Sequence, residues 1–275
     1  MILYADDAVL FCDASTHEEL QTTLEREFIE ISNWYTDNRL TNNVKKTKLI
    51  LAGSKRMLSL FEDFELQPNG TQIDRVQSFK YLRVTTDAKW SWKPHISNLL
   101  KKLGYRLSLF NRIFHMLDNR TRIPFYNGLV LPHLDYADTV WGDQPGQKWK
   151  NCKVFRTRKI KLGKMSSSEA LKHLNWLPLA VRRLSHRCIA VENAIKGNIP
   201  QHFESFKSTL TNSHGYNTRN GYLPRLPKAK TECGRRVSYF RFLNDWMSLP
   251  AFLRKPMPCA IFKKNLTNFL MNNYL

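Results

Sequence analysis

The chain has 275 residues and a net charge of +20, with 43 Lys and Arg against 23 Asp and Glu. This length fits one or two folded domains, and a hydrophobic content of 42% excludes a disordered chain. No apolar run reaches the roughly 18 residues that a membrane span requires, and the N-terminus lacks the basic start of a signal peptide. We therefore expect a globular intracellular protein, cytoplasmic or nuclear, that is neither secreted nor bound to a membrane.

The positive charge is concentrated in the C-terminal part of the chain. Residues 1–100 contain 12 basic and 14 acidic side chains, whereas residues 101–275 contain 31 basic and 9 acidic ones. Clustered Lys and Arg bind polyphosphate backbones through counterion release. The charge therefore predicts a nucleic acid as the partner of the C-terminal part, and a solvated basic surface without a specific partner is the alternative.

Cysteine and histidine spacing indicates neither disulfides nor zinc. The five cysteines are odd in number, far apart and never arranged as Cys-x-x-Cys. This pattern is typical of reduced thiols in an intracellular protein. No Cys or second His lies at metal-binding spacing from His95, so we expect His95 to be a packed side chain and predict no zinc site.

The first predicted element is a β-hairpin. Two apolar runs, residues 1–4 and 8–12, flank Ala5-Asp6-Asp7, which places two adjacent carboxylates at the tip. Ser15 and Glu18 then form a capping box, and apolar residues at helical spacing predict a helix over residues 16–38.

Short strands are expected between this helix and residue 92. The apolar residues 49–52 are typical of a strand that ends at Gly53. Asn69-Gly70 favours a hairpin turn between residues 64–67 and 72–76. Residues 79–86 continue as another strand.

The pattern becomes helical after residue 92. Pro94 is well placed in the first turn of a long helix over residues 93–117, and a second helical region covers about 120–141. Residues 148–164 carry eight Lys or Arg in seventeen positions without a clean period, which indicates an irregular basic linker.

Further helical and apolar segments are expected towards the C-terminus. Ser166 and Glu169 form another capping box, and Gly197 ends a helix over residues 181–196. Apolar segments follow at residues 237–246 and 261–270.

The Asp6-Asp7 pair is the candidate reactive feature. Like charges a few ångström apart are costly unless a cation neutralises them. Adjacent strand residues point to opposite faces, so one of the two carboxylates is expected to lead and the other to assist. Carboxylate oxygens favour Mg²⁺ or Mn²⁺, and pairs of such ions about 3.5–4 Å apart serve nucleotidyl transfer. An exposed Asp-Asp turn without a metal is the alternative, and the dipeptide alone favours it.

The surrounding residues resemble a known family. Residues 2–11 (ILYADDAVLF) resemble the catalytic Tyr-Ala-Asp-Asp hairpin of reverse transcriptases. Residues 43–47 (NVKKT) resemble the Asn-x-x-Lys-Thr element of the palm of non-LTR, LINE-type retrotransposon enzymes, and residues 79–82 (FKYL) resemble their primer-grip hairpin. Other segments, which resemble the thumb and C-terminal region of jockey-like elements, are 133–142 (HLDYADTVWG), 166–178 (SSSEALKHLNWLP), 214–220 (HGYNTRN) and 246–250 (WMSLP). The matches run in family order over essentially the whole chain.

The resemblance implies an α+β fold with four regions. These are an incomplete polymerase palm over residues 1–92, made of a β-hairpin, a helix and antiparallel strands; a helical thumb over 93–147; a basic linker over 148–165; and a basic helical C-terminal region over 166–275. It also implies a fragment of an RNA-directed DNA polymerase that performs nucleotidyl transfer by a two-metal mechanism. The implied cofactor is Mg²⁺ or Mn²⁺, and the implied partners are an RNA template and a DNA primer.

The resemblance also implies roles for individual residues. Asp6 would be the main metal ligand and Asp7 a weaker, assisting one, both catalytic. Lys46 would be a third catalytic residue that stabilises the pyrophosphate leaving group, with a solvated lysine as the alternative. The residues implied to bind nucleic acid are Tyr81, Leu82, Lys101, Lys102 and Arg106. A buried strand aromatic is the alternative interpretation of Tyr81.

Some expected features are missing from this sequence. In the family, the third metal-binding aspartate and the fingers precede the hairpin, so we expect the 275-residue chain to be inactive as a polymerase by itself. Arg83 stands where the primer-grip pattern has Gly, and a side chain there is expected to strain the turn. Two alternative interpretations stay open: a non-catalytic basic nucleic-acid-binding fragment, and a functionless product of a degenerate element copy.

Overall fold

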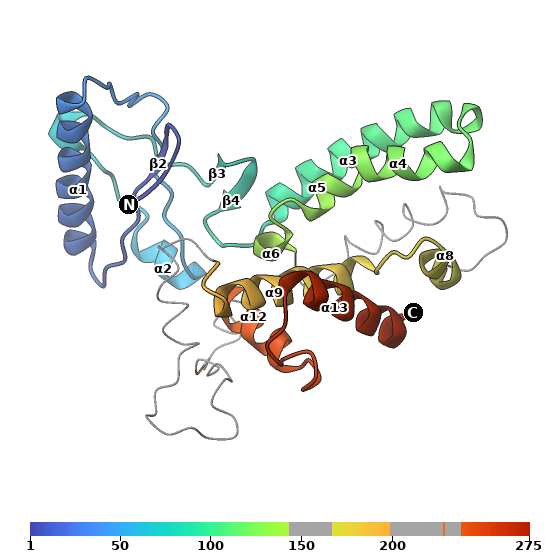
Figure 1. Cartoon of the computed structure of the whole chain (residues 1–275). Coiled ribbons are helices and arrows are strands. Elements are labelled where there is room, and N and C mark those ends of the chain that lie inside the picture. Colours follow the sequence, from blue (N-terminus) through green and yellow to red (C-terminus); the bar gives the residue numbers. More distant parts are fainter. Residues whose placement is uncertain (143–166, 199–227, 229–237) are drawn as a thin grey trace, which may run out of the picture. The chain divides into compact units, whose positions relative to one another are not determined.

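A computed structural model describes residues 1–142, 167–198, 228 and 238–275. These residues form helices and two small antiparallel sheets, as expected for the α+β class (Figure 1). They divide into two compact units, Met1–Lys102 and Leu103–Leu275. The predicted linker over 148–165 and the segment 214–220 lie outside the described residues.

The predicted N-terminal hairpin is confirmed. Strand β1 (Ile2–Tyr4) pairs antiparallel with β2 (Asp7–Val9), and Tyr4 lies opposite Asp7. The chain therefore reverses within two residues, Ala5 and Asp6. Ala5 has a φ of 52°, in the left-handed region that two-residue hairpin turns require and that glycine usually occupies.

Helix α1 (His17–Asp37) confirms the predicted helix, but its capping residues lie one position later than predicted. The Thr16 side chain accepts a hydrogen bond from the Glu19 amide, and the Glu19 carboxylate accepts one from the Ser15 amide. Ser15 therefore stands just outside the helix, while Thr16 is its N-cap.

A hydrophobic cluster in the N-terminal unit joins several of its separate segments. The buried members are Leu24, Leu49, Phe64, Leu66 and Ile73. Leu10 and Cys12, just after β2, pack against this cluster, and so does Val44. The hairpin and the segment that contains Lys46 are therefore anchored to the same core.

Three of the predicted strands in this unit, residues 49–52, 64–67 and 72–76, do not form. Leu49 makes only an isolated bridge with Arg75, so residues 49–52 are not a strand. The turn at Asn69-Gly70 does form, as the short helix η1 (Pro68–Gly70), and the Ile73 amide donates to the Leu66 carbonyl beyond it. The flanking segments are held by burial of their apolar side chains rather than by a continuous ladder. A short helix, α2 (Lys55–Leu60), lies between residues 49–52 and 64–67 and was not predicted.

Residues 79–86 form a hairpin, as the resemblance of residues 79–82 to a primer-grip hairpin implies, and not the single strand that their apolar content predicts. Strand β3 (Ser78–Tyr81) pairs antiparallel with β4 (Val84–Asp87), and Tyr81 lies opposite Val84. The turn residues Leu82 and Arg83 have φ values of 42° and 66°. The expected strain at Arg83 thus has a structural basis, because both residues occupy the left-handed region.

We expect Arg83→Gly to stabilise the protein by about 0.5–1 kcal/mol, since glycine relieves a left-handed conformation at the cost of some chain entropy. Urea unfolding of the full chain measures this change. Lys80→Gly is the matched control: Lys80 lies inside β3, where glycine should destabilise by a similar amount. Equal destabilisation by both changes would show that the turn is not strained.

Helix α3 (Lys93–Ile113) confirms the predicted long helix, and the short helix η2 (Phe114–Met116) extends it. The loop before α3 is organised by Asp87, which is 8% exposed. Its carboxylate accepts hydrogen bonds from the amide and hydroxyl of Ser91 and from the amide of Trp92. One side chain therefore ties the end of β4 to the start of the helix.

The predicted helical region over 120–141 is broken into three helices. These are α4 (Asn119–Leu129), α5 (Leu131–Asp135) and α6 (Asp138–Trp141). Pro132 starts a new helix, and Ala137, with a φ of 51°, separates α5 from α6. The breaks turn Asp135, Asp138 and Trp141 towards different partners.

The remaining helices among the described residues belong to the C-terminal unit. They are α8 (Ser167–His173), α9 (Leu179–Ile195), α12 (Ser238–Met247) and α13 (Cys259–Tyr274). Residues from α9, α12 and α13 form one buried cluster, which includes Val191, Leu243 and Leu266. Gly197, with a φ of 74°, follows the end of α9 as predicted.

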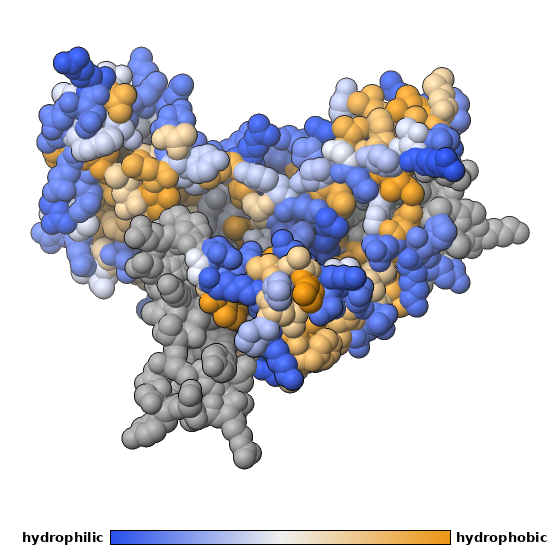
Figure 2. Space-filling model, viewed as in Figure 1, coloured by the Kyte–Doolittle hydropathy of each residue, from blue (hydrophilic) through white to orange (hydrophobic). Residues whose placement is uncertain are grey.

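The visible surface of the protein is mostly hydrophilic, with some apolar residues. Figure 2 shows hydrophilic residues over most of the visible face of α1 and a mixture of hydrophobic and hydrophilic residues over α12 and α13. None of the described helices combines the length and apolar composition needed to cross a bilayer.

The three cysteines within the described residues, Cys12, Cys188 and Cys259, are free thiols. Complete burial raises the pKa of the Cys188 thiol to about 12.

Candidate functional site

Asp6 and Asp7 lie at the exposed tip of the β1–β2 hairpin. Asp6 is the second turn residue and Asp7 is the first residue of β2. Within the described residues, no hydrogen bond or ion pair engages either carboxylate. The turn therefore leaves both carboxylates exposed to solvent, where they are available to a cation.

The hairpin supplies suitable ligand atoms, but few of them. Carboxylate oxygens are the ligands that Mg²⁺ prefers, and this ion takes about six in octahedral geometry. Among the described residues, the side chains that could form a three-ligand metal group lie elsewhere, in the C-terminal unit. Asp6 and Asp7 thus fit a divalent ion chemically, while most of its ligands would have to come from water, substrate or further residues.

Lys46 lies in an exposed turn of the same unit. The Asn43 side chain and carbonyl both accept hydrogen bonds from the Lys46 amide, at 3.2 and 2.9 Å, and Val44 anchors the turn to the core. The Lys46 ammonium extends into solvent. No ion pair links it to Asp6 or Asp7 in the part of the chain that the structure describes.

Tyr81 and Leu82 occupy the end of β3 and the adjoining turn. Tyr81 is half-buried, and its hydroxyl is shielded from solvent without a hydrogen-bond partner among the described residues. Such a hydroxyl fits the alternative of a packed strand aromatic better than a solvent-facing contact. His95 is also packed: its Nδ1 accepts a hydrogen bond from the Thr85 amide at 3.3 Å. Burial, and secondarily the charge of Lys102, lowers the pKa of His95.

The three predicted cations of α3 differ in their surroundings. Lys101 and Lys102 are exposed, whereas the half-buried Arg106 donates to the Leu129 carbonyl at 3.3 Å and so joins α3 to α4. Tyr105 is 67% exposed and lies one turn after Lys101. The exposed part of α3 therefore combines positive charge with an accessible aromatic ring.

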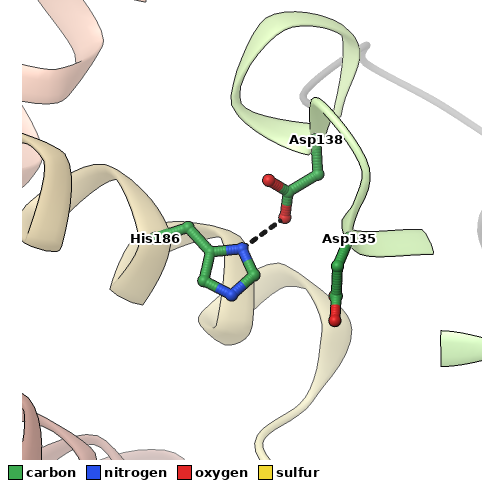
Figure 3. A group of neighbouring side chains, drawn as sticks. All are labelled: Asp135, Asp138 and His186. Carbon is green, nitrogen blue, oxygen red and sulfur yellow. Dashed lines mark hydrogen bonds and ion pairs between the residues drawn. The ribbon is translucent and has the colours of Figure 1, made fainter. Parts of the chain in front are cut away.

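A second polar cluster contains Asp135, Asp138 and His186 (Figure 3). Asp135 forms a bidentate pair with Arg182, with N–O distances of 2.7 and 2.6 Å. Asp138 is 2% exposed, and its carboxylate lies 2.8 Å from Nδ1 of His186. Because Arg182 already engages Asp135, a metal ion would have to displace a guanidinium, and we interpret the cluster as an ion-pair network.

The neighbouring residues extend this network. The Trp141 indole donates to the Tyr136 carbonyl at 2.9 Å, and the Arg183 guanidinium lies 5.2 Å from the centre of the Trp141 ring. Arg183 also donates to the Gly142 carbonyl. Segment 133–142 is therefore attached to α9 by its polar residues, a role that the resemblance did not predict. The sequence signal that could have indicated a polar contact surface on α9 is the group of basic residues Arg182, Arg183, His186 and Arg187 within one predicted helix.

Comparison of the chain with protein families, with curated proteins and with solved structures found no match. The residues themselves are therefore the basis for assigning a function.

Proposed function

We propose that the chain is the C-terminal part of a non-LTR retrotransposon reverse transcriptase. In its intact form, such an enzyme adds deoxynucleotides to a DNA primer on an RNA template. The observation that carries the proposal is the β1–β2 hairpin, which presents Asp6 and Asp7 together at an exposed tip within the sequence Tyr-Ala-Asp-Asp.

The proposed roles follow from charge and position. The Asp6 and Asp7 carboxylates hold Mg²⁺, with Asp6 as the leading ligand. Bound divalent ions supply charge neutralisation at the triphosphate and activation of the primer hydroxyl. The Lys46 ammonium stabilises the negative charge that develops on the pyrophosphate.

The basic region would hold the template and primer. Lys101 and Lys102 contribute exposed positive charge on α3, and residues 101–275 carry 31 basic side chains against 9 acidic ones. Such a surface binds phosphate backbones with little sequence preference, and its affinity falls steeply with salt. An RNA–DNA duplex is therefore expected to bind at low salt and to dissociate as salt is raised.

We expect Asp6→Asn to weaken Mn²⁺ binding about tenfold, because the amide removes the charge of the leading ligand. Titration of the full chain with Mn²⁺, followed by electron paramagnetic resonance, measures this change. Asp63→Asn is the matched control, since Asp63 is an exposed carboxylate that does not belong to the hairpin. Equal Mn²⁺ affinity of the two variants would contradict the metal site.

Primer extension tests the activity separately. The 275-residue chain alone is expected to extend no primer in Mg²⁺, because two carboxylates at one turn do not complete a two-metal site. Extension by the chain alone would contradict this expectation.

A second candidate function is nucleic-acid binding without catalysis. The exposed cations of α3 favour it, and they do not depend on the hairpin. Duplex binding by wild type that is unchanged in Asp6→Asn, combined with no measurable Mn²⁺ binding by wild type, would support this candidate over the polymerase fragment.

A further inference from the structure

An open cavity of about 260 Å³ lies along α13 in the C-terminal unit. Carboxamides and phenyl rings line it, namely those of Asn265, Asn268, Asn272, Asn273, Phe252 and Phe269. No charged side chain is among these residues. The lining therefore offers hydrogen-bond donors and acceptors beside flat apolar surfaces.

Helix geometry places these amides on one face. Asn265, Asn268 and Asn272 follow the spacing i, i+3, i+7, so they lie in a row along the helix. A different face of α13 is held in the core by Phe262, Leu266 and Leu270, which are 1%, 0% and 1% exposed. The row of amides is thus presented by a firmly packed helix.

The asparagine side chains differ in whether they already form hydrogen bonds within the protein. Asn273 donates to the Phe269 carbonyl at 2.7 Å, and Asn265 contacts the Met257 sulfur at 3.8 Å. Asn268 and Asn272 are exposed and have no hydrogen-bond partner within the described ranges. Two carboxamides one turn apart are therefore available to a ligand.

The two rings form a wall beside the amides. Phe252 lies 6.2 Å from Phe269, with an interplanar angle of 76°. Phe252 is 52% exposed, although its neighbour Leu253 is completely buried and fixes the position of the loop. An exposed phenyl ring on a rigid loop is a suitable surface for stacking a planar group.

The chain segment that lines the cavity is basic, which favours an anionic ligand. Residues 246–275 contain Arg254, Lys255, Lys263 and Lys264 and no Asp or Glu. Lys264 precedes Asn268 by one turn and is exposed. Neutral amides can form hydrogen bonds with a polar planar ring, and nearby cations can bind a phosphate attached to it. This combination favours a nucleotide as the ligand.

We propose that this face of α13 binds an unpaired base of a single-stranded nucleic acid. A carboxamide can form two hydrogen bonds with adenine, Phe252 stacks on the ring, and the lysines contact the flanking phosphates. The volume is below the roughly 300–1,000 Å³ of pockets for drug-sized ligands, which suits one base and not a whole cofactor. The site consists of residues other than Asp6 and Asp7, and it does not depend on the proposed polymerase function.

Fluorescence anisotropy of the full chain tests the proposal with two labelled ten-nucleotide strands, oligo(A) and an abasic strand of equal charge. We expect wild type to bind oligo(A) about tenfold more tightly, and Asn268→Ala, Asn272→Ala and Phe252→Ala each to lose most of this preference. Alanine favours the helix at the two Asn positions, so these variants should fold.

Asn111→Ala, at an exposed position of α3, is the matched control and should keep the full preference. Asp6→Asn should also keep it, which separates this site from the proposed metal site. Equal binding of the two strands by wild type, or an unchanged preference in Asn268→Ala, would overturn the proposal. Equal strand binding together with reduced self-association of Phe252→Ala would assign the face to a second copy of the chain instead.

Discussion

Asp245→Ala is expected to lower the free energy of unfolding of the C-terminal unit by about 3 kcal/mol. The Asp245 carboxylate on α12 accepts a hydrogen bond from Nε of Arg187 on α9, and the Arg187 side chain is only 7% exposed. Removing the carboxylate leaves a buried guanidinium without that counter-charge. Urea unfolding, followed by circular dichroism, measures the loss.

Two further variants test whether the loss of stability comes from the buried ion pair or from lost packing contacts. Asp74→Ala removes an exposed partner of Lys48, since the Asp74 side chain is 72% exposed, and should cost less than about 1 kcal/mol. The double change Arg187→Met and Asp245→Leu should recover most of the stability, because apolar pairs can replace buried ion pairs. Equal losses for Asp245→Ala and Asp74→Ala would show that burial of the pair does not matter.

Leu266→Ala is expected to destabilise the same unit by about 2–5 kcal/mol, because it removes buried apolar volume and leaves a cavity. Leu266 is 0% exposed and belongs to the cluster that α9, α12 and α13 share. The same packing positions the row of asparagines on the outer face of α13. Thermal or urea unfolding of the full chain measures the effect.

Ile261→Ala is the matched control for this change. Ile261 lies on the same helix, one turn and a half before Leu266, and is 49% exposed. Its truncation should therefore cost well under the loss at Leu266. A similar cost at both positions would mean that α13 is not held by the face that the structure buries.

Local patterns predicted most of the helices and one of the hairpins. Apolar spacing predicted α1, α3 and α9 within a few residues of their observed ends, and the Ala5-Asp6-Asp7 interruption predicted the β1–β2 hairpin. Each of these signals depends on residues close together in the chain. The position of Asp6 and Asp7 at this hairpin was predictable for the same reason.

The predicted strand over residues 49–52 was wrong, because a strand needs a paired neighbour and Leu49 finds only a single bridge with Arg75. The strand over residues 79–86 was wrong for a different reason. Its apolar content is that of a strand, but the chain reverses at Leu82 and Arg83 with positive φ at both residues. Neither residue is a usual choice for such a turn, so its local signal was absent.

The sequence by itself determined the class of fold, the position of the paired aspartates and the concentration of positive charge beyond residue 100. Only the tertiary structure decided which polar groups meet. Arg182 pairs with Asp135 across 47 positions and His186 with Asp138 across 48. The row of asparagines on α13 becomes a lined cavity only because Phe252 packs beside it from another segment. Periodicity and turn chemistry are local, whereas these contacts depend on how helices pack, which sequence spacing does not specify.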